Sequence, residues 1–313
     1  MLLERTVEAA DSGRVLRDYI KREFDISSRL LRKIKARSLI TVNGNVTFTN
    51  AILREGDLLR IDLGSLAAPS ESIVPEDIPI DILYEDNYLI VINKQAGLII
   101  HPSTVEGSGT IANGLARHFE RTGCRAMIHP ISRLDRGTSG VILFAKDSYT
   151  ANCLGEALRG GEFEKEYLGV AEGAPYPPAG AIDLPLGRVD GYIMLRAVRC
   201  GGKRAMTYYE TIYSARGMSL LRLRPITGRT HQLRAHLSGI GLPLVSDGLY
   251  GPFGPTDPDI ISHMPLIARQ ALHSWRLTFR HPHTSETLVV TAPPPDDFRA
   301  LLNYIGYGIM DLC

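Results

Sequence analysis

The chain has 313 residues, of which 44% are hydrophobic and 22% charged, so it holds apolar material for about two folded domains and is not a largely disordered protein. The net charge of +1 hides a segregation, because residues 14–39 contain nine Lys or Arg against three acids. The sequence shows no membrane-spanning apolar run, no signal peptide and no C-x-x-C pair. We therefore expect a cytoplasmic protein without membrane contact, zinc ribbon or disulfide framework.

The first predicted element is a basic helix that begins near residue 16. Leu16, Tyr19 and Ile20 recur at helical spacing and mark a buried face, while Arg17 and Lys21 fall on the other side. A basic helix face attracts a polyanion, so we expect these two residues to contact a polyanionic partner, and the resemblance given below implies that this partner is RNA. Ordinary solvation of a helix face explains the same charges equally well.

A second basic helix is predicted over residues 29–39. Ser27 or Ser28 offers its N-cap, and the apolar residues recur on one face, so that bases including Arg32 and Lys33 face outward. We expect these two residues to bind RNA as well.

Two short strand-like runs then flank Asn43-Gly44, which is a strong turn signal for a β-hairpin, and residues 56–63 predict a further strand. Two basic helices followed by a hairpin resemble the alpha-L RNA-binding module named after a small-subunit ribosomal protein. A segment rich in proline and acidic residues follows and predicts a linker. The expected organisation is an RNA-binding module at 1–63, a linker at 64–80 and a catalytic domain at 81–313.

Strand-like runs outnumber helical patterns after residue 81. The runs lie at 88–94, 140–146, 164–173, 206–213 and 220–225, and helical patterns lie near 110–119, 148–159 and 229–238. Strands and helices do not alternate regularly, and no glycine-rich nucleotide-binding motif is present. The sequence therefore predicts an α+β fold and disfavours a nucleotide-cofactor enzyme.

Asp135 lies between Arg133 and Arg136 in a turn-rich segment just before the strand-like run at 140–146. Two adjacent guanidiniums favour the ionised carboxylate. A carboxylate kept ionised on a loop can act as a nucleophile or accept a proton. From spacing alone, an ion cluster that caps a surface turn is the commoner outcome.

The helical pattern near 229–238 carries Arg229, His231, Gln232, Arg234 and His236. Guanidinium and amide groups at a helix start suit phosphate and base contacts. The alternative is an amphipathic helix with ion pairs along its polar face. The two histidines lack the H-E-x-x-H pattern, so no metal site is expected.

Tyr167 alternates with Glu166 and Leu168 in the strand-like run at 164–173, where a packed core aromatic is the commoner fate. A carboxylate hydrolase would require a second positioned carboxylate, for which Glu164 and Glu166 are weak candidates.

Six segments, in one order across residues 81–300, resemble the RluA family of pseudouridine synthases. These segments are NKQAGLIIHP (93–102), SRLDRGTSG (132–140), EKEYLGVAEG (164–173), GGKRAMTYYE (201–210), GRTHQLRAHL (228–237) and LHSWRLTFRHPHTSE (272–286). The resemblance implies a mixed, largely antiparallel β-sheet in the catalytic domain. It implies an isomerase that converts uridine to pseudouridine in structured RNA, without metal or organic cofactor. Large-subunit ribosomal RNA is the favoured partner, transfer RNA is the alternative, and we expect a monomer.

The resemblance also implies roles for single residues. Asp135 is the catalytic aspartate, Tyr167 stacks on the extruded base and helps to remove its C5 proton, and Arg229 pairs with Asp135. The expected substrate or RNA contacts in this domain are Arg133, which also braces the loop, Arg136, His231, Gln232 and Arg234. Departures from the family pattern are Ser132 in place of a usual His, Gly137 where an acid is frequent, and Gln95 in place of Pro. The competing hypothesis is a non-catalytic RNA-binding or ribosome-assembly protein on the same fold.

Overall fold

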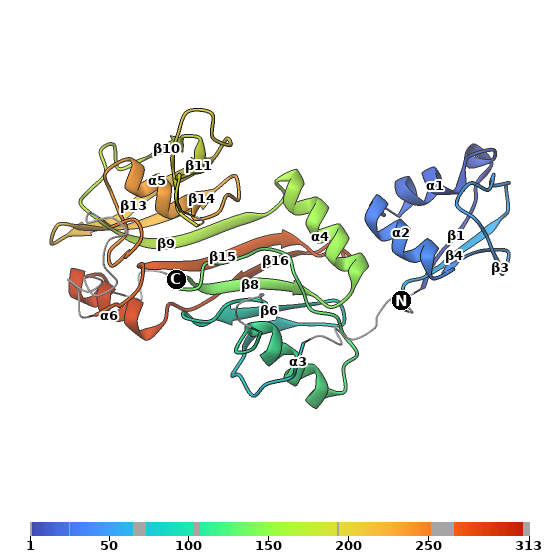
Figure 1. Ribbon diagram of the computed structural model, residues 1–313, viewed down its shortest axis with the longest axis horizontal. Helices are drawn as coiled ribbons and strands as arrows, with labels where there is room; N and C mark the ends of the chain where they lie inside the picture. Colours follow the sequence, from blue (N-terminus) through green and yellow to red (C-terminus); the bar gives the residue numbers. More distant parts are fainter. Residues whose placement is uncertain are drawn as a thin grey trace.

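The computed structural model describes residues 2–24, 26–64, 73–102, 107–192, 194–251 and 266–308. A four-stranded sheet near the N-terminus and a ten-stranded sheet each carry their own hydrophobic core (Figure 1). None of the helices in these ranges has the length and apolar character needed to cross a membrane.

The N-terminal module packs two helices on a sheet with strand order β1-β4-β2-β3. Its elements are β1 (Leu2–Thr6), the 3-10 helix η1 (Ala9–Asp11), α1 (Leu16–Glu23), α2 (Ser28–Ala36), β2 (Ile40–Val42), β3 (Asn45–Val46) and β4 (Leu58–Asp62). The predicted faces are confirmed, since α1 buries Leu16, Tyr19 and Ile20. The Ser27 side chain caps α2 by accepting a hydrogen bond from the Leu30 amide.

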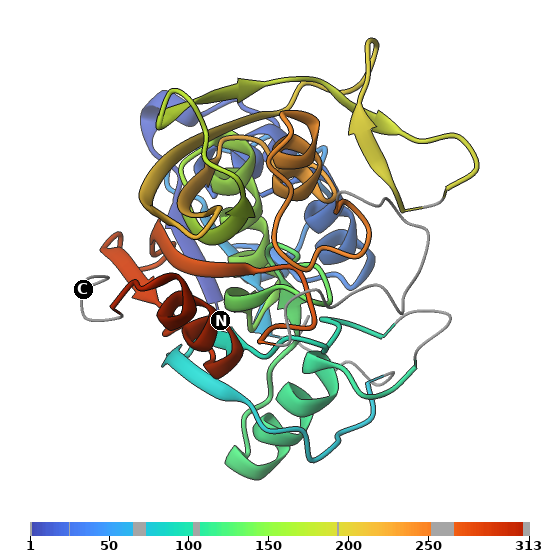
Figure 2. The same cartoon turned by 90° about the vertical axis from the view of Figure 1, so that its left-hand side faces the viewer.

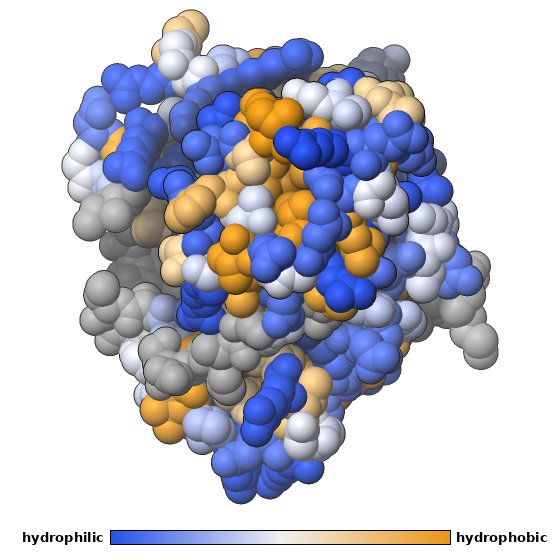
Figure 3. Space-filling model, turned by 90° about the vertical axis from the view of Figure 1, so that its right-hand side faces the viewer, coloured by the Kyte–Doolittle hydropathy of each residue, from blue (hydrophilic) through white to orange (hydrophobic). Residues whose placement is uncertain are grey.

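The hairpin turn at Asn43-Gly44 is also confirmed. Both residues have positive φ, 52° and 82°, as the tightest hairpin turns require. Figure 3 views the molecule from the side of this module and shows apolar side chains among polar ones. The exposed large apolar residues of the module are Leu2, Val46, Phe48 and Ile52.

The module contacts the rest of the chain through α4 (Ser148–Gly160). Helix α2 lies against α4, and Tyr149 of α4 packs against the core of the module. The middle of the expected linker, 65–72, lies outside the described residues. Its later part is packed, because Ile73 is buried with the core around α3 (Ile111–Thr122) and the Asn113 side chain donates to the Val74 carbonyl at 2.8 Å.

The large sheet has the order β10-β13-β14-β9-β15-β8-β6-β5, with β16 beside β15 and β7 beside β8. Only the β15–β8 pair is parallel among the described strands, so the mixed, largely antiparallel sheet is confirmed. The strands are β5 (Asp81–Glu85), β6 (Leu89–Lys94), β7 (His129–Pro130), β8 (Ser139–Ala145), β9 (Glu164–Glu172), β10 (Ala179–Asp183), β13 (Met206–Ala215), β14 (Met218–Pro225), β15 (Leu272–Arg280) and β16 (Thr287–Thr291).

Helices pack on both faces of this sheet, which explains why β8 is buried at every position and why β6 begins with four consecutive apolar residues. In β6, Ile90 and Ile92 pack toward α3, while Leu89 and Val91 pack toward α4. The remaining helices are α5 (Gln232–Gly239) and α6 (Asp296–Ile305). A separate hairpin of β11 (Leu186–Arg188) and β12 (Arg196–Val198) packs beside α5 and reaches out from the sheet (Figure 2).

The parallel contact of β8 with β15 requires a glycine. Gly140 has φ +107°, and a Cβ atom built on it would overlap the backbone carbonyl of Ser274 in β15. The two strands therefore approach at this point as only glycine allows. This contact sets the position of the segment that precedes β8, which contains Asp135.

We expect Gly140→Ala to lower the free energy of unfolding by about 3 kcal/mol, since a steric overlap adds to an unfavourable φ. Gly123→Ala is the matched control, because Gly123 has φ +67° but open space around its Cβ position. It should cost only about 1 kcal/mol. Chemical denaturation measures both, and equal losses would show that the β8–β15 contact adds nothing.

Candidate active site

The Asp135 carboxylate lies on the loop between β7 and β8, and its side chain keeps 25% of its surface exposed. The loop rests on Lys94 at the end of β6. The Lys94 amine is fully buried and donates to the carbonyls of Gln95, Leu98 and Arg136 at 2.9, 2.8 and 3.1 Å. Burial, and after it the nearby Arg269, lowers the pKa of Lys94 to about 7, although three carbonyl acceptors favour the protonated amine.

The other side of the loop is held by Arg269 and Gln270. The Arg269 guanidinium donates to the Gly137 carbonyl at 2.9 Å and to both carboxylate oxygens of Asp297 at 2.7 and 2.9 Å. The Gln270 amide donates to the Thr138 hydroxyl at 3.2 Å. A Cβ at position 137 would overlap the Gln270 side-chain oxygen. The packing of Gln270 against position 137 therefore explains why glycine fits there in this chain.

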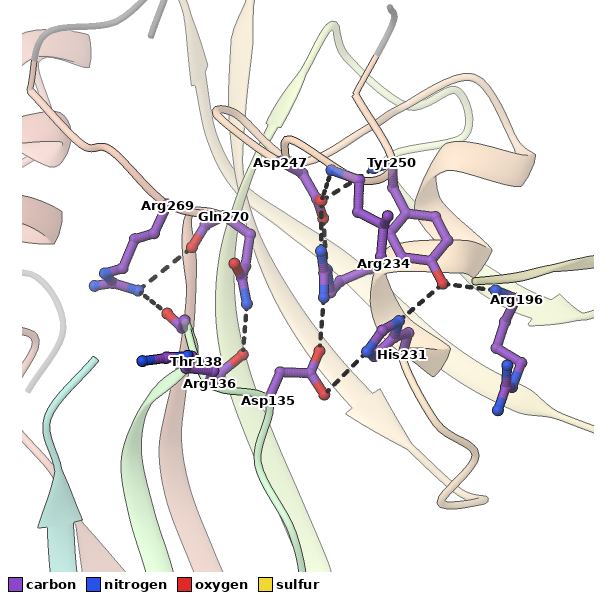
Figure 4. A network of polar contacts seen from close by, with 12 residues as sticks. Asp135, Arg136, Thr138, Arg196, His231, Arg234, Asp247, Tyr250, Arg269 and Gln270 are labelled. Atoms are coloured by element: carbon purple, nitrogen blue, oxygen red, sulfur yellow. Dashed lines mark hydrogen bonds and ion pairs between the residues drawn. The ribbon is translucent and has the colours of Figure 1, made fainter. Parts of the chain in front are cut away.

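Arg234 is the arginine that pairs with Asp135. Its Nη1 donates to Asp135 Oδ2 at 3.0 Å (Figure 4). Its Nε and Nη2 donate to the two oxygens of Asp247, both at 2.7 Å. The Asp247 side chain is fully buried and accepts further hydrogen bonds from the amides of Leu249 and Tyr250. These contacts raise the pKa of Arg234 despite its burial, so a fixed positive charge faces the Asp135 carboxylate.

This arrangement corrects the expected pairing of Arg229 with Asp135. The Arg229 Nε donates to the Arg204 carbonyl at 3.0 Å instead. The neighbours of Asp135 in the sequence do not supply the pairing guanidinium either, because Arg133 is exposed and Arg136 Nε donates to the Gly97 carbonyl at 2.9 Å. The guanidinium that contacts the carboxylate comes from Arg234 of α5.

His231 faces the second oxygen of the carboxylate, with its Nε2 3.9 Å from Asp135 Oδ1. The residue precedes α5 and has φ 53°, in the left-handed region. This conformation turns the ring toward the loop, and only 8% of the side chain is exposed. Burial lowers the pKa of His231, partly offset by the Asp135 charge.

The side chains of Gln232 and His236 are buried and hydrogen-bond to neighbouring parts of the chain. The Gln232 oxygen accepts from the Thr227 hydroxyl and the Arg229 amide, and its nitrogen donates to Met206 and Thr207. His236 contacts the Thr207 hydroxyl and the Leu184 carbonyl. With Arg234 also buried, the expectation that Gln232 and Arg234 contact RNA phosphates conflicts with their placement. Gln232 positions the backbone before α5, and Arg234 positions the Asp135 carboxylate.

Tyr167 lies half-buried in β9, opposite Ser274 of β15, and packs against the apolar cluster that includes Leu244 and Leu272. The pKa of Tyr167 is raised to about 12, chiefly by burial; the hydrogen bond with Ser274 lowers it and the Asp135 charge raises it. The phenol is therefore neutral near pH 7. It offers a ring face and a hydroxyl beside the carboxylate, and it is a weak proton acceptor.

The four basic residues expected to bind RNA in the module lie on α1 and α2. Arg17, Arg32 and Lys33 are exposed and Lys21 is half-buried. Burial, and after it the charge of Lys33, lowers the pKa of His129, which begins β7. Because His129 pairs with Ala145, at the end of β8 away from Asp135, helix α2 brings positive charge to that end of the sheet.

Lys94, Asp247, Tyr250 and Arg269 were not identified as site residues from the sequence. Lys94 lies inside the segment 93–102, and Asp247 lies in VSDGLYG (245–251), shortly after the segment 228–237. Their partners are backbone groups or residues far along the chain, which no local pattern reveals.

The comparisons with known proteins agree with the six sequence segments. Residues 88–239 match the family described as RNA pseudouridylate synthase. An uncharacterised RNA pseudouridine synthase of Bacillus subtilis (strain 168) is 38% identical over 281 residues, covering 90% of this chain and 95% of the relative. The ribosomal large subunit pseudouridine synthase D of Nitrosomonas europaea is 36% identical over 250 residues, covering 80% of this chain and 72% of the relative. The solved structure of human RNA pseudouridylate synthase domain containing 4 superposes with a TM-score of 0.58 at 28% identity, over 72% of this chain and 92% of that one.

The buried ion pair of Arg234 with Asp247 gives a stability prediction. Asp247→Asn should lower the free energy of unfolding by about 3 kcal/mol, because it leaves a buried guanidinium without its counter-charge. Asp297→Asn is the matched control, since Asp297 makes the same bidentate contact with Arg269 but has a side chain that is 35% exposed. It should cost about 1 kcal/mol. Equal losses in chemical denaturation would contradict the importance of burial at Asp247.

Proposed function

The chain belongs to the RNA pseudouridylate synthase family and is an isomerase that acts on uridine in RNA, and from that premise we propose that Asp135 is its catalytic residue and ribosomal RNA its substrate. The observation that carries the assignment of Asp135 is its placement. The carboxylate remains partly open to solvent, Arg234 holds one of its oxygens, and its charge raises the pKa of Tyr167 in β9.

The proposed reaction begins with a uridine turned out of its RNA stack into the site. Asp135 then attacks C1′ of the ribose or removes a proton from the sugar, and the N1–C1′ bond breaks. The detached uracil turns, and its C5 bonds to C1′ while the bond from C1′ to the Asp135 oxygen breaks or, in the alternative, while the sugar regains its proton. The C5 proton is then lost and N1 gains one. The product is an isomer of the substrate, so the steps balance without an oxidant or reductant.

Each neighbour has a role that follows from its contacts. Arg234 holds one oxygen of the carboxylate by a charge-assisted hydrogen bond and so orients it. Tyr167 supplies a ring on which the extruded base can stack, as unpaired bases do on aromatic side chains. Its high pKa makes it a poor base at neutral pH, so we favour the stacking role over removal of the C5 proton. Arg133, Arg136 and Arg229 border this region and can contact the RNA backbone.

The substrate class rests on two observations. The relatives include enzymes named for the ribosomal large subunit, which supports ribosomal RNA over transfer RNA. The exposed bases of α1 and α2 support phosphate contacts by an RNA-binding module at 1–63. We propose a catalytic unit at 81–313 to which residues 73–80 are packed, acting as a monomer in the cytoplasm. A non-catalytic RNA-binding role is disfavoured because the carboxylate is both held and accessible.

Asp135→Asn should fold and bind RNA but lose isomerisation to background, because an amide is neither a nucleophile nor a base at this pH. Release of tritium from 5-tritiated uridine in ribosomal RNA measures the reaction. Asp296→Asn, at an exposed position of α6 away from the site, is the control and should keep wild-type turnover. Turnover by Asp135→Asn near the wild-type rate would rule out the assignment.

The module gives a second prediction. A double variant, Arg32→Gln with Lys33→Gln, should weaken RNA binding and flatten its salt dependence, by about one unit of slope for each lost phosphate contact. The control double variant, Arg54→Gln with Arg60→Gln, removes equal charge from exposed positions of the same module outside its helices. The same salt slope in both variants would mean that α2 is only a solvated face.

A further inference from the structure

A chain of polar contacts runs from the β11–β12 hairpin to the catalytic carboxylate (Figure 4). The backbone amide of Arg196 in β12 lies 2.9 Å from the Tyr250 hydroxyl. That hydroxyl lies 3.0 Å from Nδ1 of His231, and Nε2 of the same ring lies 3.9 Å from Asp135 Oδ1. None of these contacts was expected from the sequence.

The direction of the hydrogen bonds follows from what each group can do. A backbone N–H can only donate, so the Tyr250 oxygen accepts from Arg196. In the described part of the chain, the remaining polar neighbour of this hydroxyl is His231 Nδ1, so the phenol proton has an acceptor only if Nδ1 carries no proton. A buried hydroxyl without an acceptor would be costly.

The opposite end of the ring leads to the same conclusion. Nε2 faces the Asp135 carboxylate, which attracts an N–H and repels a nitrogen lone pair. Burial lowers the pKa of His231, so the ring carries one proton at neutral pH. Both ends of the imidazole therefore favour the same tautomer.

We propose that Tyr250 is a positioning residue which, held by the Arg196 amide, fixes His231 as the Nε2–H tautomer so that this N–H points at Oδ1 of Asp135. The inference rests on the proposed catalytic role of Asp135. Arg234 then hydrogen-bonds to Oδ2, while the His231 N–H faces Oδ1 with 3.9 Å between Nε2 and the oxygen, an electrostatic contact that is too long for a hydrogen bond. The two groups together favour one rotation of the carboxylate.

Packing makes the arrangement rigid. Tyr250 is buried in a small cluster with Leu186, Ala205 and Ala235, and its ring meets the His231 ring edge-on at 5.6 Å. The Arg234 guanidinium lies over the Tyr250 ring, 4.9 Å from its centroid. Leu186 belongs to β11 and Arg196 to β12, so a shift of this hairpin would move Tyr250 and, through His231, change the orientation of the carboxylate.

The tautomer is measured directly by NMR of the full-length chain labelled with ¹⁵N-histidine, with the His231 signals assigned by their absence in His231→Gln. The wild-type protein should show a protonated Nε2 and an unprotonated Nδ1. Tyr250→Phe should shift the ring toward the Nδ1–H form or into exchange between the two. An Nδ1–H tautomer in the wild-type protein would overturn the proposal.

Kinetics give the second measurement. Tyr250→Phe should lower kcat for isomerisation about tenfold, as the loss of one hydrogen bond in the site allows, with little change in KM for RNA. Tyr84→Phe is the control, because it removes a phenol hydrogen bond to Asp86 at β5 and should leave kcat unchanged. An unchanged kcat in Tyr250→Phe, with an unchanged tautomer, would contradict the proposal.

A matched pair at position 231 separates orientation from folding. His231→Gln keeps an N–H donor and His231→Met does not, and both bear the same left-handed backbone. The Gln variant should retain about tenfold more activity, and equal activity would count against the proposal.

The groups that face His231 and set its pH profile are Asp135, Arg234, Asp247, Tyr250 and Arg196. An inactive wild-type enzyme would contradict the proposed function, whereas the NMR measurement tests the tautomer independently of turnover.

Discussion

The bidentate ion pair between Arg234 and Asp247 is the interaction on which the geometry of the site depends. Two hydrogen bonds of 2.7 Å fix the plane of the guanidinium, and its remaining Nη1 then has one direction in which to donate, toward Asp135. Burying a charged pair costs desolvation, and this pair recovers the cost through good geometry and the backbone amides that also bind Asp247. The ion pair therefore fixes the position of α5, and with it the orientation of His231 just before the helix.

The elements of the fold were largely predictable because their signals are local. Period-2 and helical spacing, the Ser27 cap and the Asn43-Gly44 turn each act within a few residues, and the structure contains them where expected. Helix α6 was missed although Phe298, Leu301, Leu302 and Ile305 repeat at helical spacing. The packing of the later part of the linker could not be predicted, because Ile73 finds its apolar partners on α3 and composition alone does not reveal a tertiary partner.

The site was only partly predictable, because one motif offers two arginines and the sequence does not say which one faces the loop. Arg229 and Arg234 differ by five positions, and the left-handed conformation of His231 lies between them. That turn sends Arg229 outward to the Arg204 carbonyl and leaves Arg234 under the carboxylate. Lys94 bonds to backbone carbonyls, which have no side-chain identity to recognise. Such contacts can be found only once the chain is folded.

The close approach of Gly137 and Gln270 couples two positions that lie far apart in the sequence. A Cβ atom at position 137 would overlap the Gln270 side-chain oxygen, and the Gln270 amide nitrogen donates to the Thr138 hydroxyl on the same loop. A residue larger than glycine at position 137 therefore requires the Gln270 side chain to turn away, at the expense of its hydrogen bond with Thr138. The two positions are coupled, so the effect of a substitution at one depends on the residue present at the other.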